Sequence, residues 1–175
     1  IDKGVINKII EAINPKNLDQ ILEIGPGLGA LTSQILNKVD HIDVVEIDPD
    51  MIKILQEKLP PSKITIFPLN ILEMSNDAIG KYDKVIGNLP YYISSEILLK
   101  MIKTINNQQD LHFMLQKEVA ERISSSTHSK SYGRLSVMLQ YFFDIELLFD
   151  IKPESFSPPP KVTSSLVRLI PKINH

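Results

Sequence analysis

An asparagine, a proline and two tyrosines follow an apolar run in the stretch VIGNLPYYISS. Pro90 fixes its own φ and has no backbone N–H, while Gly87 frees the backbone just before it. The resulting turn would hold one amide side chain, Asn88, and one aromatic ring, Tyr91, near the end of a strand. As structure alone, the stretch is equally typical of a plain connection between a strand and a helix.

A glycine-rich stretch, ILEIGPGLGALT, ends another apolar run and opens a helix. Gly25, Gly27 and Gly29 let the backbone turn tightly and come close to a ligand. With Ala30 they give a loose G-x-G-x-x-A, which is also typical of dinucleotide-binding folds. Glu46 ends the next strand about twenty residues later, where a carboxylate can accept both hydroxyls of a ribose. This pattern suits NAD and S-adenosylmethionine equally.

Three features favour S-adenosylmethionine over NAD. Glu23 stands two residues before the first glycine, where its carboxylate can meet the ammonium end of a methionine moiety. Pro26 removes one of the N–H groups that a pyrophosphate cradle would use. The fourth strand ends in Asn-Leu-Pro-Tyr, for which a hydride transferase has no evident need, whereas an amine methyltransferase does.

The chemistry of an aromatic amine explains that need. The exocyclic nitrogen of adenine is a poor nucleophile because its lone pair is delocalised into the ring. The Asn88 side-chain oxygen and the Leu89 carbonyl could accept its two hydrogens and favour a pyramidal nitrogen, while Pro90 stiffens the loop. Tyr91 would stack on the extruded base, so its ring should matter and its hydroxyl should not. A sulfonium methyl is already activated, so positioning would do most of the work without a metal or a strong base.

The elements that position these residues alternate along the chain. Apolar runs of strand length are separated by amphipathic helical stretches, which predicts a parallel sheet covered by helices on both faces. The strands are QILEIG, HIDVVEI, KITIFPL, YDKVIGN and LHFMLQ, and the helical stretches are residues 31–36, 51–59 and 94–105.

After about residue 134 the alternation changes. A helical stretch, LSVMLQYFF, leads to DIELLFDI and SSLVRLI, which a proline-rich loop joins without a helix. Two such strands should pair antiparallel. The sequence therefore predicts an α/β fold with a mostly parallel, seven-stranded sheet and a late antiparallel strand. No linker divides residues 1–175, so we expect one domain.

Composition excludes several other classes of protein. The 175 residues are 43% hydrophobic and 23% charged, as in ordinary globular proteins. Without cysteine there is no disulfide or thiolate metal site, and the four histidines lack metal-ligand spacing, so no metal is expected. The apolar runs are too short to cross a bilayer. The net charge of −2 does not by itself indicate a nucleic-acid binder.

Taken together, the motifs resemble those of the ribosomal RNA adenine N6-dimethyltransferases, and most of all the small-subunit branch whose loss gives kasugamycin resistance in bacteria. The resemblance covers essentially the whole chain and implies a Rossmann-like class I methyltransferase. The motifs that carry it, in the family's order, are LEIGPGLGALT, VEIDPDM, GNLPYYISS, HFMLQKEVAERI, YGRLSVMLQYF and FSPPPKVTSSLVRL.

The resemblance implies a set of residues that hold S-adenosylmethionine. The methionine end is framed by Glu23, Gly25, Gly27 and Gly29; Glu46 takes the ribose, Ile47 packs on the adenine, and Asn88 borders the methyl group. The family usually has Asp at the position of Asn70, where the side chain contacts the amino group of the cofactor adenine. An Asn oxygen can still accept that hydrogen bond, but without charge.

The resemblance also implies the substrate side of the site. Residues 88–91 (Asn88, Leu89, Pro90 and Tyr91) form the methyl-transfer loop, and Phe156 stacks on the target adenine from the other side. The substrate would be small-subunit ribosomal RNA within an immature subunit, and the enzyme a cytoplasmic monomer that contacts no membrane. A QNFL-like N-terminal arm and a helical C-terminal domain are missing, so the chain is expected to be the catalytic domain alone.

Three alternatives remain open. One is the macrolide-resistance methyltransferase of large-subunit RNA, which shares the fold and the Asn-Pro-Tyr loop. Another is a mitochondrial relative with a role in transcription. The third is a ribosome-assembly factor that binds RNA without needing catalysis.

Overall fold

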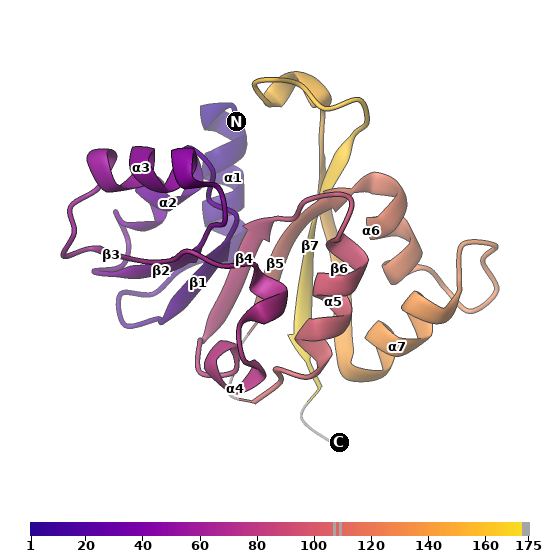
Figure 1. Ribbon diagram of the computed structural model, residues 1–175. Coiled ribbons are helices and arrows are strands. Elements are labelled where there is room, and N and C mark those ends of the chain that lie inside the picture. Colours follow the sequence, from indigo (N-terminus) through magenta and orange to yellow (C-terminus); the bar gives the residue numbers. More distant parts are fainter. Residues whose placement is uncertain (107, 109, 173–175) are drawn as a thin grey trace.

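The computed structural model describes residues 1–106, 108 and 110–172. Within these residues, seven strands form one sheet in the order β3-β2-β1-β4-β5-β7-β6 (Figure 1). The strands are β1 (Ile21–Ile24), β2 (Ile42–Val45), β3 (Ile64–Phe67), β4 (Lys84–Asn88), β5 (Asp110–Gln116), β6 (Phe143–Ile151) and β7 (Ser164–Pro171).

The pairing of the strands confirms the predicted mixed sheet. Strands β1 to β5 pair in parallel, whereas β7 runs antiparallel to both of its neighbours, β5 and β6. The last strand is therefore inserted between two earlier ones, a placement that the sequence did not predict. Because β7 runs back along β5, the loop of residues 152–163 before it lies at the edge where β4 and β5 end, and it extends past that edge in Figure 1.

The helices of the described residues include the four predicted helical stretches. They are α1 (Lys3–Ile13), α2 (Ala30–Ile35), α3 (Pro49–Lys58), α4 (Asn76–Ile79), α5 (Ser94–Ile102), α6 (Lys117–Ser124) and α7 (Arg134–Phe142), with short 3-10 turns at Ile71–Glu73 and Pro153–Ser155. Helix α5 ends before the predicted residue 105. There the Thr104 hydroxyl donates to the Met101 carbonyl at 2.9 Å and competes with the next helical turn. Helices α1, α4 and α6 were not among the predicted helical stretches.

Two hydrophobic cores lie on opposite faces of the sheet. Side chains alternate along each strand, so Leu22 and Ile24 pack in the core beneath α5, α6 and α7, while Ile21 packs in the core beneath α1, α2 and α3. The two groups of helices are separate in Figure 1. This alternation also places Glu23 on the face that α2 covers. Among the described residues, no helix combines the length and the hydropathy needed to span a membrane.

Candidate active site

The two predicted ligand loops meet at one edge of the sheet. Strands β1 and β4 are neighbours, and Ile24 lies opposite Gly87, so the glycine-rich loop and the Asn-Leu-Pro-Tyr loop leave the sheet side by side. A Cβ atom on Gly87 would collide with the carbonyl oxygen of Ile24, so only glycine permits this approach. In open parallel sheets, ligands bind at this carboxyl edge.

The predicted catalytic residues line one cavity of about 340 Å³. Four come from the end of β4 and the loop that follows it, and Phe156 comes from the loop between β6 and β7. The lining residues are Asn88, Leu89, Pro90, Tyr91, Phe156, Pro158, Pro159 and Pro160. The structure therefore brings together all five residues that were expected on the substrate side, and it places an aromatic ring from each loop around the same space.

Hydrogen bonds fix the backbone of the Asn-Leu-Pro-Tyr turn. The Leu89 N–H donates to the Met114 carbonyl of β5 at 3.2 Å, and the buried Leu89 side chain joins the core beneath α5. The Ile93 N–H donates to the Pro90 carbonyl at 3.2 Å. Leu89 is thus an anchor, which leaves the exposed Asn88 side chain at the edge of the sheet.

A second cavity, of about 270 Å³, lies beside the first and contains the predicted methionine end of the cofactor site. Glu23, Gly25 and Gly27 line it. Asn88 and Phe156 line both cavities. A methyl donor and its acceptor must be adjacent for direct transfer, and these two cavities share a wall at the residue that is expected to orient the amine.

Glu23 is a buried carboxyl group with one polar partner. The Thr32 hydroxyl of α2 donates to its Oε2 at 2.6 Å. Burial raises the pKa of Glu23 to about 7; the Thr32 hydrogen bond lowers it, and the nearby charge of Glu46 raises it further. A cationic group in the adjacent cavity would restore the charged carboxylate, which suits the ammonium of a methionine moiety.

Glu46 directly follows β2, and its carboxylate accepts hydrogen bonds from three backbone N–H groups. Its Oε1 accepts from Ile47 and Asp48, both at 3.0 Å, and its Oε2 accepts from Gly27 at 3.2 Å. This last bond links the carboxylate directly to the glycine-rich loop. A carboxylate has about four acceptor positions, so three backbone donors leave less room than the two ribose hydroxyls were expected to find. Glu46 thus shapes the loop in addition to any contact with a ribose.

The glycine-rich loop needs its glycines for two different reasons. Gly25, Gly27 and Gly29 all have positive φ angles, of 63°, 55° and 75°, in the region that favours glycine. At Gly29, which precedes α2, an added Cβ would also lie 2.8 Å from Cδ2 of the buried Leu55. At Gly27 an added Cβ would meet nothing within 4 Å, so that position opens toward the cavity.

Four predicted cofactor residues are not among those that line either cavity: Gly29, Glu46, Ile47 and Asn70. Ile47 is 62% exposed after β2, and Asn70 follows β3. The Asn70 Oδ1 accepts from the Leu72 N–H at 3.0 Å and caps the 3-10 turn. The oxygen that was expected to receive the cofactor adenine therefore already has a partner. Their roles in binding stay predictions.

Sequence reasoning missed three residues of this region. Thr32 holds Glu23, Met114 supplies the carbonyl that holds Leu89, and the Ser164 hydroxyl lies 2.8 Å from the Tyr91 hydroxyl. Thr32 lies within the same glycine-rich motif as Glu23, which is a signal that could have been used. Ser164 is far from Tyr91 in sequence, and no local pattern indicates their contact.

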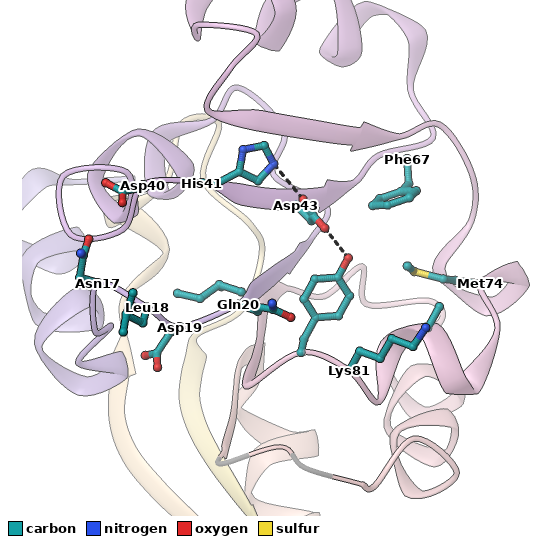
Figure 2. Close-up of a pocket in the computed structure, with 13 residues that line it drawn as sticks. Asn17, Leu18, Asp19, Gln20, Asp40, His41, Asp43, Phe67, Met74 and Lys81 are labelled. Atoms are coloured by element: carbon teal, nitrogen blue, oxygen red, sulfur yellow. Dashed lines mark hydrogen bonds and ion pairs between the residues drawn. The ribbon is translucent and has the colours of Figure 1, made fainter.

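A larger cavity, of about 540 Å³, lies away from this edge (Figure 2). Much of its lining comes from residues just before β1, β2 and β4, at the amino ends of the parallel strands: Asn17, Leu18, Asp19, Gln20, Asp40, His41, Lys81 and Tyr82. Its central acid, Asp43, accepts from the Tyr82 hydroxyl at 2.6 Å and lies 3.1 Å from His41 Nε2. None of the predicted site residues lines it.

The chain is similar to known proteins over its whole length. A family model described as ribosomal RNA adenine dimethylase matches residues 1–175. The ribosomal RNA small subunit methyltransferase A of Dechloromonas aromatica (strain RCB) is 46% identical over 172 residues, which are 98% of this chain and 68% of that protein. The chain thus spans about two thirds of the length of this curated relative.

Two solved structures share the fold closely. A dimethyladenosine transferase from Plasmodium falciparum has a TM-score of 0.89 at 31% identity, covering 98% of this chain and 62% of that one. The 23S rRNA methyltransferase ErmE has a TM-score of 0.85 at 26% identity, covering 99% of this chain and 70% of that one. Both resemblances extend over nearly all of this chain.

Proposed function

Because this chain belongs to the ribosomal RNA adenine dimethylase family, we propose that it transfers methyl groups from S-adenosylmethionine to the N6 amine of adenines in small-subunit ribosomal RNA. One observation carries the proposal beyond family membership: Asn88 and Phe156 line both the cavity beside Glu23 and the cavity beside Tyr91. The predicted cofactor and substrate residues therefore face a common boundary, where direct transfer takes place.

The residues of the smaller cavity suit S-adenosylmethionine. Glu23 is a buried carboxyl group that needs a cation to be stably charged, and the ammonium of a methionine moiety supplies one. The open side of Gly27 leaves space where a side chain would otherwise stand. When bound, the cofactor supplies an activated methyl group on a sulfonium. The hydrogen bond from the Gly27 N–H to the Glu46 carboxylate holds the glycine-rich loop in the shape that receives the cofactor.

The residues of the larger of these two cavities suit an extruded adenine. The rings of Tyr91 and Phe156 provide stacking surfaces, and stacking is the usual way in which proteins hold unpaired bases. The Asn88 side-chain oxygen and the Leu89 carbonyl accept the hydrogens of the amine and direct its lone pair toward the methyl group. The anchored Leu89 keeps this loop rigid, so the catalytic contribution is positioning.

Small-subunit RNA is the substrate that the relatives favour. The D. aromatica protein carries that substrate in its name, and it is more similar to this chain than ErmE, whose title names 23S rRNA. A protein that only assembles ribosomes or assists transcription would not need Asn88 for its activity. Methyl transfer is therefore the property that separates these alternatives.

The first prediction tests Asn88 on the 175-residue chain. Labelled S-adenosylmethionine would be supplied with immature small subunits from a strain that lacks this methylation, and in parallel with large-subunit RNA. We expect labelled N6-dimethyladenosine in the small-subunit RNA only. Asn88→Ala should slow transfer by roughly 10² or more, the scale of losing one preorganised polar contact in a transition state.

Asn7→Ala is the matched control, because Asn7 is an exposed asparagine on α1, away from the loop. It should keep the wild-type rate. Near-normal transfer by Asn88→Ala, with its unfolding midpoint unchanged, would remove Asn88 from the mechanism. Wild-type protein that binds the subunits and the cofactor but transfers no methyl group would contradict the proposed function.

A further inference from the structure

Tyr91 is tied to the last strand of the sheet by its hydroxyl group. The Tyr91 hydroxyl lies 2.8 Å from Oγ of Ser164, the first residue of β7. Ser164 is fully buried, while Tyr91 is half-buried beside the cavity. Either hydroxyl can donate to the other. A stacking ring needs no hydroxyl, so this contact gives the tyrosine a function that stacking does not explain.

Ser164 is a fixed point in the sheet. It lies opposite Gln116 of β5 on one side and Ile151 of β6 on the other. The next residue, Ser165, donates its hydroxyl to Asp150 Oδ1 at 2.7 Å, which further ties β7 to β6. A residue held between two strands offers a rigid partner to a side chain in a loop.

The Tyr91 ring, in contrast, is not fixed by its backbone alone. The turn is held by the bond from Ile93 N–H to the Pro90 carbonyl, and the Ser94 hydroxyl donates to the Tyr91 carbonyl at 3.3 Å. These bonds set the position of the Tyr91 backbone but leave rotation about its side-chain torsions. The bond to Ser164 restrains the far end of the ring and so selects one ring orientation.

We propose that Ser164 is a positioning residue, which holds the Tyr91 ring at the orientation and spacing from Phe156 that a flat base requires. The inference rests on the proposed function, since it concerns the adenine cavity. Phe156 lies in the loop that runs directly into β7, so the same segment of chain carries one stacking ring and the hydroxyl that orients the other. Ser164 touches neither substrate nor cofactor and acts through Tyr91.

The test is a double-mutant cycle on methyl transfer to immature small subunits, with wild type, Ser164→Ala, Tyr91→Phe and the double variant. Each single variant should lower kcat about tenfold, which is the scale of losing one intramolecular hydrogen bond. The KM for S-adenosylmethionine should not change. The double variant should be no slower than the single ones, because both changes break the same bond.

Ser165→Ala is the matched control: it removes a buried β7 hydroxyl at the neighbouring position, whose partner is Asp150 and not Tyr91. It should keep the wild-type kcat. Tyr91→Phe probes the same bond from the loop, so the cycle remains informative if Ser164→Ala destabilises the sheet.

Three outcomes would overturn the proposal. Effects of the two single variants that multiply in the double variant would show that Ser164 does not act through Tyr91. An equal loss of kcat in Ser165→Ala would show a general role of β7 in stability. Wild-type protein without methyl transfer would remove the proposed function and this inference together, whereas an active wild type with multiplying effects would remove only the inference.

Discussion

At Glu23, a single carboxyl group couples the stability of the fold to pH. Its pKa rises from 4.5 to about 7, chiefly because of burial. The folded protein therefore binds this proton more tightly than the unfolded chain does, and the free energy of unfolding should fall as pH rises through this interval. A pKa change of this size contributes about 3 kcal/mol to the free energy of unfolding at low pH. This contribution is lost as the pH rises from 4.5 to about 8.

Glu23→Gln should remove this part of the pH dependence, because the amide stays neutral throughout. Urea unfolding of the cofactor-free protein across this pH range would measure it. Relative to wild type, the variant should gain stability as pH rises. Glu57→Gln, at an exposed position on α3, should keep the wild-type slope. Parallel curves for wild type and Glu23→Gln would show that Glu23 is already ionised below this range.

Glu46 is expected to affect both binding and stability. Glu46→Ala removes the acceptor of three backbone N–H groups together with the proposed ribose contact. Binding of S-adenosylmethionine should weaken by about 1.5–3 kcal/mol, the scale of losing hydrogen bonds to a charged acceptor. Calorimetry would measure this loss, with NAD as the ligand that should not bind. Equal affinity for S-adenosylmethionine in wild type and variant would exclude Glu46 from the cofactor site.

Among the elements, the turn from β1 into α2 requires glycine for two reasons: a positive φ angle at Gly27 and Gly29, and the lack of a Cβ atom next to Leu55 at Gly29. Gly27→Ala should destabilise the protein by about 1 kcal/mol, the cost of a left-handed conformation for an ordinary residue. Gly29→Ala should cost about 2–3 kcal/mol, because the buried Leu55 must also move. Chemical denaturation of both variants would check this order. If the two variants unfold at the same denaturant concentration, packing against α3 does not constrain the turn.

The elements that sequence predicted well are those with a strong local pattern. Each of the strands in the described chain has a continuous or alternating apolar run, and that pattern reports burial directly. It does not report which strands become neighbours, so the insertion of β7 between β5 and β6 was not foreseen. Helix α6 was missed as an element because it begins at Lys117, directly after β5 ends at Gln116, so no loop separates the two patterns.

The same limit applies to the site. Glu23 and Asn88 each lie within a short motif, so their roles could be proposed from the chemistry of the residues next to them in sequence. The contact of Tyr91 with Ser164 depends on long-range strand pairing and has no local signal. The hydroxyl of Tyr91 was therefore expected to be unimportant, whereas the structure gives it a buried partner. The partners that occupy Glu46 and Asn70 likewise became visible only in three dimensions.

At the scale of the whole molecule, affinity for RNA depends on which cations of the late half are not already paired with carboxylates. The late half contains five candidates, but Lys117 pairs with Asp150 at 2.7 Å and Arg122 pairs with Glu118 at 2.9 Å. The remaining candidates are Lys130, Arg134 and Lys161. Because phosphate contacts supply most of the affinity for RNA, we propose that residues 1–175 form a cofactor-binding core with weak affinity for RNA.

This proposal predicts a shallow salt dependence. With three phosphate contacts, the logarithm of the RNA association constant should change with the logarithm of salt concentration with a slope of about −2. Titrations of small-subunit RNA at several salt concentrations would measure it, alongside a relative of full length, which we expect to have a steeper slope and a higher rate of methylation. Equal slopes and rates at matched concentrations would show that this core recognises its substrate unaided.

The insertion of β7 has a consequence for the order in which the chain is made. During translation, β6 leaves the ribosome before β7, yet within the described chain β7 is the strand with which β6 pairs. There is therefore a stage of synthesis at which β1 to β5 and residues 143–151 have emerged, while the strand that pairs with residues 143–151 has not. The Tyr91 turn emerges early, but Phe156 and Ser164 emerge late. An enzyme that modifies ribosomes would thus bring Tyr91, Phe156 and Ser164 together only after β7 has left the ribosome that is synthesising the enzyme.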